Sequence, residues 1–220
     1  ETREVRRYEL QRTWIYVYYG EPTPAQIWQE IYMEWLPTEG QEGVLPEGVW
    51  SLWLIPEKIT GGVVELWLPT TALVGLSTGF LEPEPDTTMT IPATADGIVV
   101  VGAYQVSNDV VASFSGRGNT ADGRMAPTLV APGVEVVTAA PGERYTARTG
   151  TSIATPFAAG SAALMMEWGI VQGNDPYLYG EKIRAYLMKG ARKLPGQESV
   201  PDKKAGWGAL CLAASLPKLL

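Results

Sequence analysis

The sequence predicts an α/β protein in two parts, a strand-rich unit over residues 1–84 and an α/β unit over residues 85–220. Charge supports the division, because residues 1–90 hold 5 basic and 14 acidic side chains whereas residues 91–220 hold 12 and 10. Six of the eight tryptophans lie before residue 70. A stretch rich in proline and threonine, residues 82–92, separates the two parts and is typical of a linker.

The first part is predicted to consist of short antiparallel strands. Apolar runs alternate with clusters of glycine, proline and glutamate, and we expect strands at residues 12–19, 49–55, 63–68 and 71–76. Residues 26–36 fit both a helical face and one side of a strand, and their aromatic and β-branched content favours a strand. Several such strands in sequence predict a sandwich or a jelly roll.

The aromatic strands have two interpretations. Aromatic rings fill the core between two sheets in many small β domains, and this is the interpretation we favour. The alternative is a face on which the rings stack against sugars or a cell-wall polymer. Glycan binding that is lost when exposed tryptophans are mutated would distinguish the two.

The second part has the pattern of a parallel sheet covered by helices. Residues 97–103 form a continuous apolar run, as expected of a strand buried on both faces. Further strands are expected at residues 110–114, 128–131 and 134–139. Helices are expected at residues 152–168, which are rich in alanine, and at residues 178–189.

Composition excludes several classes of function. A net charge of −7 argues against nucleic-acid binding, which requires a basic surface. The single cysteine, Cys211, cannot form an internal disulfide, and no apolar run approaches the roughly 18 residues that span a bilayer. The chain contains no histidine, which removes the commonest general base.

One motif points to catalysis. Residues 150–160 read GTSIATPFAAG, which places a serine after a glycine turn at the start of a small-residue helix. The Oγ of Ser152 is therefore expected to be exposed in the positive field of a helix N-terminus, where free N–H groups can stabilise an oxyanion. The alternative is that Ser152 serves only as the helix N-cap, a position that serine favours.

The motif resembles the nucleophile segment of subtilisin-like serine peptidases, the subtilases. Four further segments match that family in order: VGAY at 101–104, ASFSGRG at 112–118, DGRMAPTLVAPG at 122–133 and GWGAL at 206–210. Upstream, RYELQRTWIYVYYG and GVWSLWLIPEKITGGVVELWLP resemble the jelly roll inserted in the Csp germination proteases. The resemblance implies the C-terminal part of a subtilisin-like parallel-sheet domain, preceded by part of an antiparallel β jelly-roll insert.

The resemblance also implies the site residues. Ser152 would be the acylating nucleophile, and Thr151 and Ser152 would contribute to the oxyanion hole. Gly150, Ile153 and Phe114 would line the substrate cleft. Phe157 stands where a non-catalytic histidine is frequent in the family.

Other parts of the machinery are expected outside this chain. Subtilases draw the catalytic aspartate, histidine and oxyanion asparagine from sequence N-terminal to the serine, so we expect them upstream of Glu1. The expected partners are that N-terminal portion of the same polypeptide and a peptide or protein substrate, and the isolated chain is expected to be inactive. The family suggests a bacterial spore or cell envelope as the location.

Three alternatives compete with an active subtilase of the ordinary kind. The protein could be an inactive pseudopeptidase that binds a ligand or regulates a partner. The protein could also be a sedolisin-like enzyme, in which glutamate and aspartate take the place of the usual partners of the serine. The segments ASFSGRG and LVAPG favour an ordinary subtilase instead. A Ser–Lys dyad with Lys58 is rejected, because nothing places a lysine near the motif. No cofactor or metal is expected, since the loop 119–124 offers a calcium ion only Asp122 and neutral oxygens.

Overall fold

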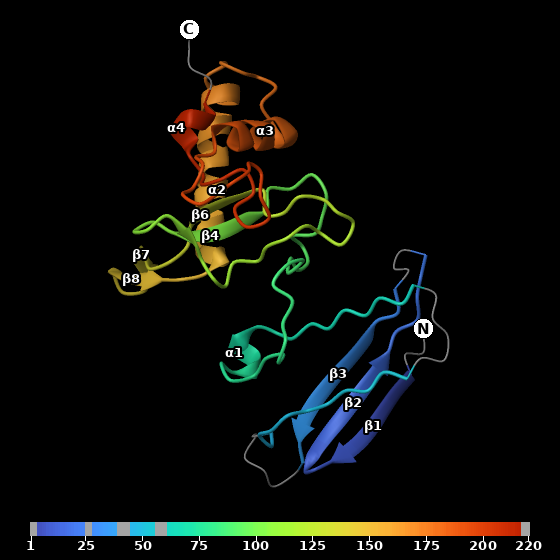
Figure 1. Cartoon of the computed structure of the whole chain (residues 1–220). Helices are drawn as coiled ribbons and strands as arrows, with labels where there is room; N and C mark the ends of the chain where they lie inside the picture. Colours follow the sequence, from blue (N-terminus) through green and yellow to red (C-terminus); the bar gives the residue numbers. More distant parts are fainter. Residues whose placement is uncertain (1–3, 25–27, 39–44, 56–60, 217–220) are drawn as a thin grey trace. The chain divides into compact units, whose positions relative to one another are not determined.

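The computed structural model describes residues 4–24, 28–38, 45–55 and 61–216 (Figure 1). The chain forms two compact units, Glu1–Trp67 and Leu68–Leu220. We expected a domain boundary near residue 84, and the compact units divide earlier in the sequence.

The first unit contains one antiparallel sheet, with strand order β1-β2-β3. Its strands are β1 (Glu4–Leu10), β2 (Thr13–Tyr19) and β3 (Ile31–Pro37). Gln11 and Arg12 join β1 to β2 with φ angles of 48° and 65°. Two consecutive positive φ angles are the mark of a type I′ hairpin turn, whose twist matches that of the strands. The strands expected at residues 12–19 and within 26–36 are thereby confirmed, although residues 26 and 27 lie outside the described residues.

Three other predicted strands are wrong. Residues 49–55 and 63–68 are extended but pair with no strand in the described part of the chain, and Trp53 is 85% exposed. Their composition favours a strand, but a strand forms only where a partner strand accepts its hydrogen bonds. Residues 71–76 contain the one-turn helix α1 (Thr71–Val74), which Gly75 ends at a φ of 83°.

The second unit is built on a small mixed sheet with strand order β5-β4-β6. Its strands are β4 (Val101–Gln105), β5 (Val110–Val111) and β6 (Leu129–Pro132). β4 runs parallel to β6 and antiparallel to β5. A parallel bridge between Val130 and Ala209 extends the sheet beyond β6. The predicted α/β class and its parallel pairing are confirmed.

Both faces of this sheet are buried, as the apolar run predicts. On one face, Leu129 packs with Met165, Leu178, Ile183 and Leu187, and Ala103 and Ala131 pack against Ala154. On the other face, a cluster combines the sheet with the C-terminal segment: Tyr104, Val130, Leu194, Ala205 and Ala209. A hairpin of β7 (Val136–Ala140) and β8 (Arg144–Arg148) follows the sheet, and the sequence analysis missed β8.

The helices follow in the predicted order. The long helix α2 (Thr151–Met166) continues as a π-helical turn, η1 (Glu167–Val171). α3 (Gly180–Gly190) packs beside the short α4 (Leu212–Ser215). None of the helices in the described residues is long and apolar enough to cross a membrane.

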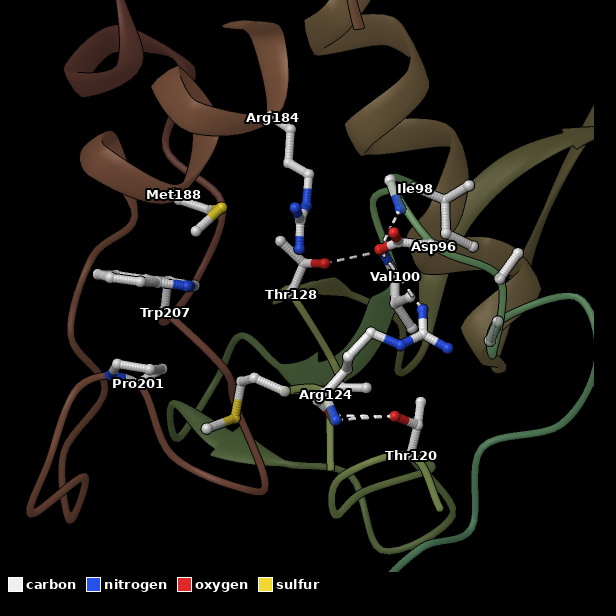
Figure 2. A pocket seen from close by; sticks show the side chains of 15 residues that line it. Asp96, Ile98, Val100, Thr120, Arg124, Thr128, Arg184, Met188, Pro201 and Trp207 are labelled. Atoms are coloured by element: carbon white, nitrogen blue, oxygen red, sulfur yellow. Dashed lines mark hydrogen bonds and ion pairs between the residues drawn. The ribbon is translucent and has the colours of Figure 1, made fainter. Parts of the chain in front are cut away.

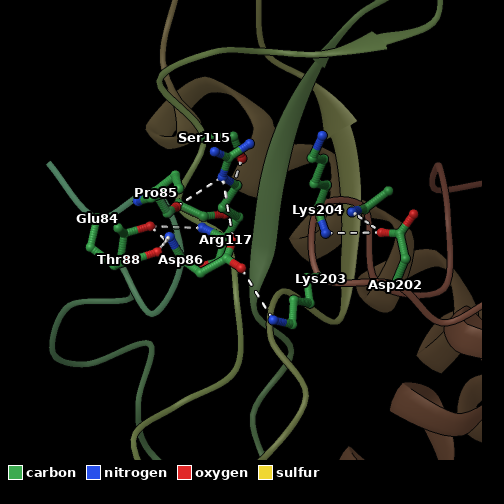
Figure 3. A network of polar contacts seen from close by, with 11 residues as sticks. Glu84, Pro85, Asp86, Thr88, Ser115, Arg117, Asp202, Lys203 and Lys204 are labelled. Atoms are coloured by element: carbon green, nitrogen blue, oxygen red, sulfur yellow. Dashed lines mark hydrogen bonds and ion pairs between the residues drawn. The ribbon is translucent and has the colours of Figure 1, made fainter. Parts of the chain in front are cut away.

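Polar contacts hold residues 84–88, which precede β4, against the rest of the second unit (Figure 3). The Arg117 N–H donates to the hydroxyl of Thr88 at 2.9 Å, and the Thr88 N–H donates to the Arg117 carbonyl at 3.0 Å. The Lys203 ammonium lies 3.2 Å from the carboxylate of Asp86. A bidentate ion pair between Arg192 and Asp109, at 3.0 and 2.7 Å, similarly holds the β4–β5 turn and keeps the pKa of Asp109 below its usual value.

The close contact of α3 with α4 gives a first prediction. A Cβ on Gly190 would lie 2.3 Å from the backbone nitrogen of Ser215, so Gly190→Ala must push the two helices apart. We expect the free energy of unfolding to fall by about 1–3 kcal/mol, the usual cost of overpacking. A Cβ on Gly180, at the start of the same helix, meets nothing within 4 Å, so Gly180→Ala is the matched control. Denaturant unfolding of both variants checks this, and equal stabilities would contradict it.

Candidate active site

The site begins at Gly150, which is the N-cap of α2. Its backbone has φ 153° and ψ 159°, a conformation that side-chain-bearing residues rarely adopt. The Gly150 carbonyl accepts hydrogen bonds from the N–H groups of Ile153, at 3.1 Å, and Ala154, at 3.3 Å. Glycine is thus required for the chain to turn sharply from β8 into the helix.

Ser152 is the second residue of α2 and is exposed. The N-cap is Gly150, and no side chain caps the helix, so the hypothesis that Ser152 serves only as the N-cap is wrong. The amides of Thr151 and Ser152 precede the first helical hydrogen bond, and helix geometry gives them no acceptor within α2. Ser152 therefore combines an accessible hydroxyl with the positive end of a helix of 16 residues.

The start of α2 is held against the sheet by a contact between small residues. The Gly150 N–H donates to the carbonyl of Gly133 at 2.8 Å. A Cβ on Gly133 would lie 2.6 Å from the Cβ of Ala103 and 3.3 Å from the Cβ of Ala154. Only glycine fits between the strand β4 and the first turn of the helix. The contact fixes the position of Ser152 relative to the carboxyl end of the sheet.

The remaining predicted site residues occupy two segments. Thr151 and Ile153 flank Ser152 in the first turn and are half-buried, and the Thr151 carbonyl accepts a hydrogen bond from the Thr155 hydroxyl at 3.0 Å. Phe114 lies in the turn after β5, and its side chain is 48% exposed. Its place in the substrate cleft stays a prediction, as do the roles of Gly150, Thr151, Ser152 and Ile153.

Among the described residues, no side chain is seen hydrogen-bonded to the Ser152 hydroxyl as a base would be. The sequence has no histidine, and Lys58 lies outside the described residues. Within the described part of the chain, no cluster of three or more His, Cys, Asp or Glu residues could hold a metal ion. Asp122, the acid of the loop considered for calcium, accepts a hydrogen bond from Thr120 and pairs with Arg124 at 2.8 Å. These two partners hold the pKa of Asp122 below its usual value.

Comparison with known proteins decides the family. A model of the subtilase family matches residues 73–208. The chain belongs to the subtilase family. It is 32% identical to the serine protease AprX of Bacillus subtilis, over 50% of this chain and 28% of that protein. It is 40% identical to subtilisin DY of Bacillus licheniformis, over 49% of this chain and 34% of that protein.

The structural comparison extends the similarity over both units. The structure of the Clostridium perfringens CspB protease matches with a TM-score of 0.71 and 31% identity, covering 98% of this chain and 45% of that chain. The resemblance to the Csp type is therefore confirmed. This subtilase chain spans less than half the length of each of these three relatives. That the first unit is part of a jelly roll stays a prediction.

Sequence reasoning missed the role of Gly133. The residue closes the LVAPG segment that suggested the family, yet a glycine in a loop motif does not reveal what packs against it. The signal in the sequence that could have revealed the contact is the presence of both Gly133 and an alanine-rich helix, since small residues allow a helix to pack closely. The contact with Ala103 and Ala154 appears only when the three segments are brought together.

The contact at Gly133 gives a second prediction. Gly133→Ala should displace the first turn of α2 and weaken the hydrogen bonds that Ile153 and Ala154 make to Gly150. We expect their amide hydrogens to exchange about tenfold faster or more, because exchange reports local opening. Gly160→Ala, on the same helix with nothing within 4 Å of an added Cβ, should leave these rates unchanged. Amide hydrogen exchange monitored by NMR measures these rates, and unchanged rates in Gly133→Ala would contradict the prediction.

Proposed function

We propose that this chain is the nucleophile-bearing portion of a serine endopeptidase. The observation that carries the proposal is the placement of Ser152 on an exposed first helical turn, fixed by glycines, within the segment that matches the subtilase family. Its substrate is a peptide or protein.

The chemistry follows from the groups at the start of α2. The Ser152 Oγ attacks the peptide carbonyl carbon and forms a C–O bond while its proton passes to a general base. The Ser152 N–H and the Thr151 hydroxyl donate to the oxyanion that develops. Collapse breaks the C–N bond, the base returns the proton to the leaving amine, and water then hydrolyses the acyl-enzyme. Gly150, Ile153 and Phe114 line the cleft around the scissile bond.

The base is proposed to come from sequence upstream of this chain. A serine hydroxyl is a weak nucleophile until a positioned group removes its proton. The chain itself contains no histidine, and it covers only 28% of AprX and 45% of the CspB chain. The aspartate, histidine and asparagine expected from the family would complete the site. The 220-residue chain alone is therefore inactive in this proposal.

The surface of α2 supports a partner of this kind. The helix contains no charged residue, and a helix that is apolar on all sides is normally buried. In this chain Phe157, Leu164 and Met166 are 41%, 54% and 42% exposed. Phe157 and Leu164, seven residues apart, lie on the same side of α2, and we infer that the upstream portion of the same polypeptide covers this side and brings the base to Ser152.

Peptide hydrolysis tests the proposed activity. In the natural polypeptide that includes the upstream portion, Ser152→Ala should lower kcat for a chromogenic peptide by at least about a thousandfold, because the acyl-enzyme cannot form. Ser107→Ala, an exposed serine in the β4–β5 turn, is the matched control and should retain full activity. Equal rates for the parent and Ser152→Ala would contradict the proposal. Absence of hydrolysis in a folded parent would favour the inactive pseudopeptidase.

Association tests the proposed partner surface. Leu164→Lys places a charge on the exposed side of α2 and should weaken binding of the separately expressed upstream portion by about tenfold or more, because the charge must be desolvated. Tyr145→Lys, at a residue of β8 that is 78% exposed, is the control and should bind normally. Calorimetric titration measures both, and equal affinities would show that α2 is not the contact surface.

A further inference from the structure

A cavity of about 360 Å³ lies in the second unit, apart from the first turn of α2. Its wall joins the segment before β4, the loop before β6, helix α3 and the C-terminal segment (Figure 2). The larger apolar side chains of the wall include Ile98, Met125, Met188, Pro201 and Trp207. The volume is in the range of small-molecule sites, which are mostly apolar with a few polar groups.

Arg184 brings to this cavity a positive charge that has no ion-pair partner among the described residues. Its Nε atom is buried and has no hydrogen-bond partner within the part of the chain that the structure describes. The side chain comes from α3 and points toward Thr128 (Figure 2). A buried donor without a partner costs free energy that a bound acceptor would recover.

Thr128 offers a second donor to the same cavity. Its side chain is 2% exposed, and its Oγ1 accepts a hydrogen bond from the Val100 N–H at 3.0 Å. Because the backbone N–H supplies the hydrogen of that bond, the hydroxyl hydrogen of Thr128 is free to donate. A guanidinium and a hydroxyl that line one cavity can both donate to a carboxylate.

The other charges at the cavity are already paired. The Arg124 guanidinium lies 2.8 Å from Asp122 and 3.5 Å from Asp96, and it donates to the Thr94 carbonyl at 2.7 Å. Asp96 also accepts a hydrogen bond from the Gly97 N–H at 2.8 Å. Arg124 is thus shared by two carboxylates, and Arg184 is the one cation among the described residues of the wall that has no ion-pair partner, so it can pair with a single anionic group.

We propose that this cavity binds a small monocarboxylate with an apolar body. The carboxylate accepts hydrogen bonds from the Arg184 guanidinium and the Thr128 hydroxyl. The apolar body contacts Met188 and Trp207, where a flexible thioether and a flat indole adapt to rings or alkyl chains. The site is separate from Ser152 and does not depend on the proposed peptidase activity.

Calorimetric titration with 3-phenylpropanoate and its uncharged amide tests the proposal on the natural polypeptide that contains this chain. We expect the acid to bind about tenfold tighter than the amide or better, because only the acid forms a charge-assisted bond to Arg184. Arg184→Met keeps the apolar stem and should remove the preference. Arg184→Lys should keep part of it. Lys189→Met, an exposed cation of the same helix, is the matched control and should bind like the parent.

Three outcomes would overturn the proposal. They are equal affinity for acid and amide, undiminished acid binding by Arg184→Met, and no acid binding at millimolar concentration. Thermal melting identifies a variant that fails to fold, and if Arg184→Met does so, the comparison of acid with amide and the Arg184→Lys variant decide. Ser152→Ala, which should lose peptidase activity, should bind the acid as tightly as the parent does. Either proposal can therefore fail without the other.

Discussion

The second unit depends on the close approach of a helix to a parallel strand pair. Gly133, Ala103 and Ala154 are small enough for the first turn of α2 to lie directly on β4 and β6. The hydrogen bond from Gly150 to Gly133 then fixes the point at which the chain enters the helix. Ser152 follows two residues later, so its position is set by backbone packing rather than by its own side-chain contacts. A site built on rigid elements in this way holds its side chains precisely.

Helix α2, which carries Ser152, also has an exposed apolar surface. One side of α2 is buried through Ala158, Ser161 and Met165, while the other presents apolar residues to solvent. In water such a surface is costly, at roughly 25 cal/mol per Å² of apolar area. The proposed upstream portion would bury this surface and supply the base at the same place. The stability of the second unit and the activity would then both depend on the contact between α2 and the upstream portion. The pocket at Arg184 is not part of this contact.

Much of the second unit could be predicted from the sequence. The apolar run before Tyr104 indicated a doubly buried strand, and the serine motif indicated the start of the helix that carries Ser152. The first unit was harder, because residues 49–55 have the composition of a strand but no partner strand in the described chain. The arginine cavity was missed for a related reason. Whether Arg184 is paired depends on residues distant in sequence, and no local pattern records that.

The central claim is that this chain supplies a competent nucleophile but not its base. Labelling with a fluorophosphonate, read by mass spectrometry, tests it most directly, since the reagent modifies only an activated serine. The account predicts labelling of Ser152 in the polypeptide that includes the upstream portion, and none in the folded 220-residue chain. Labelling of Ser152 in the 220-residue chain alone would contradict it, and so would its absence from the folded longer polypeptide.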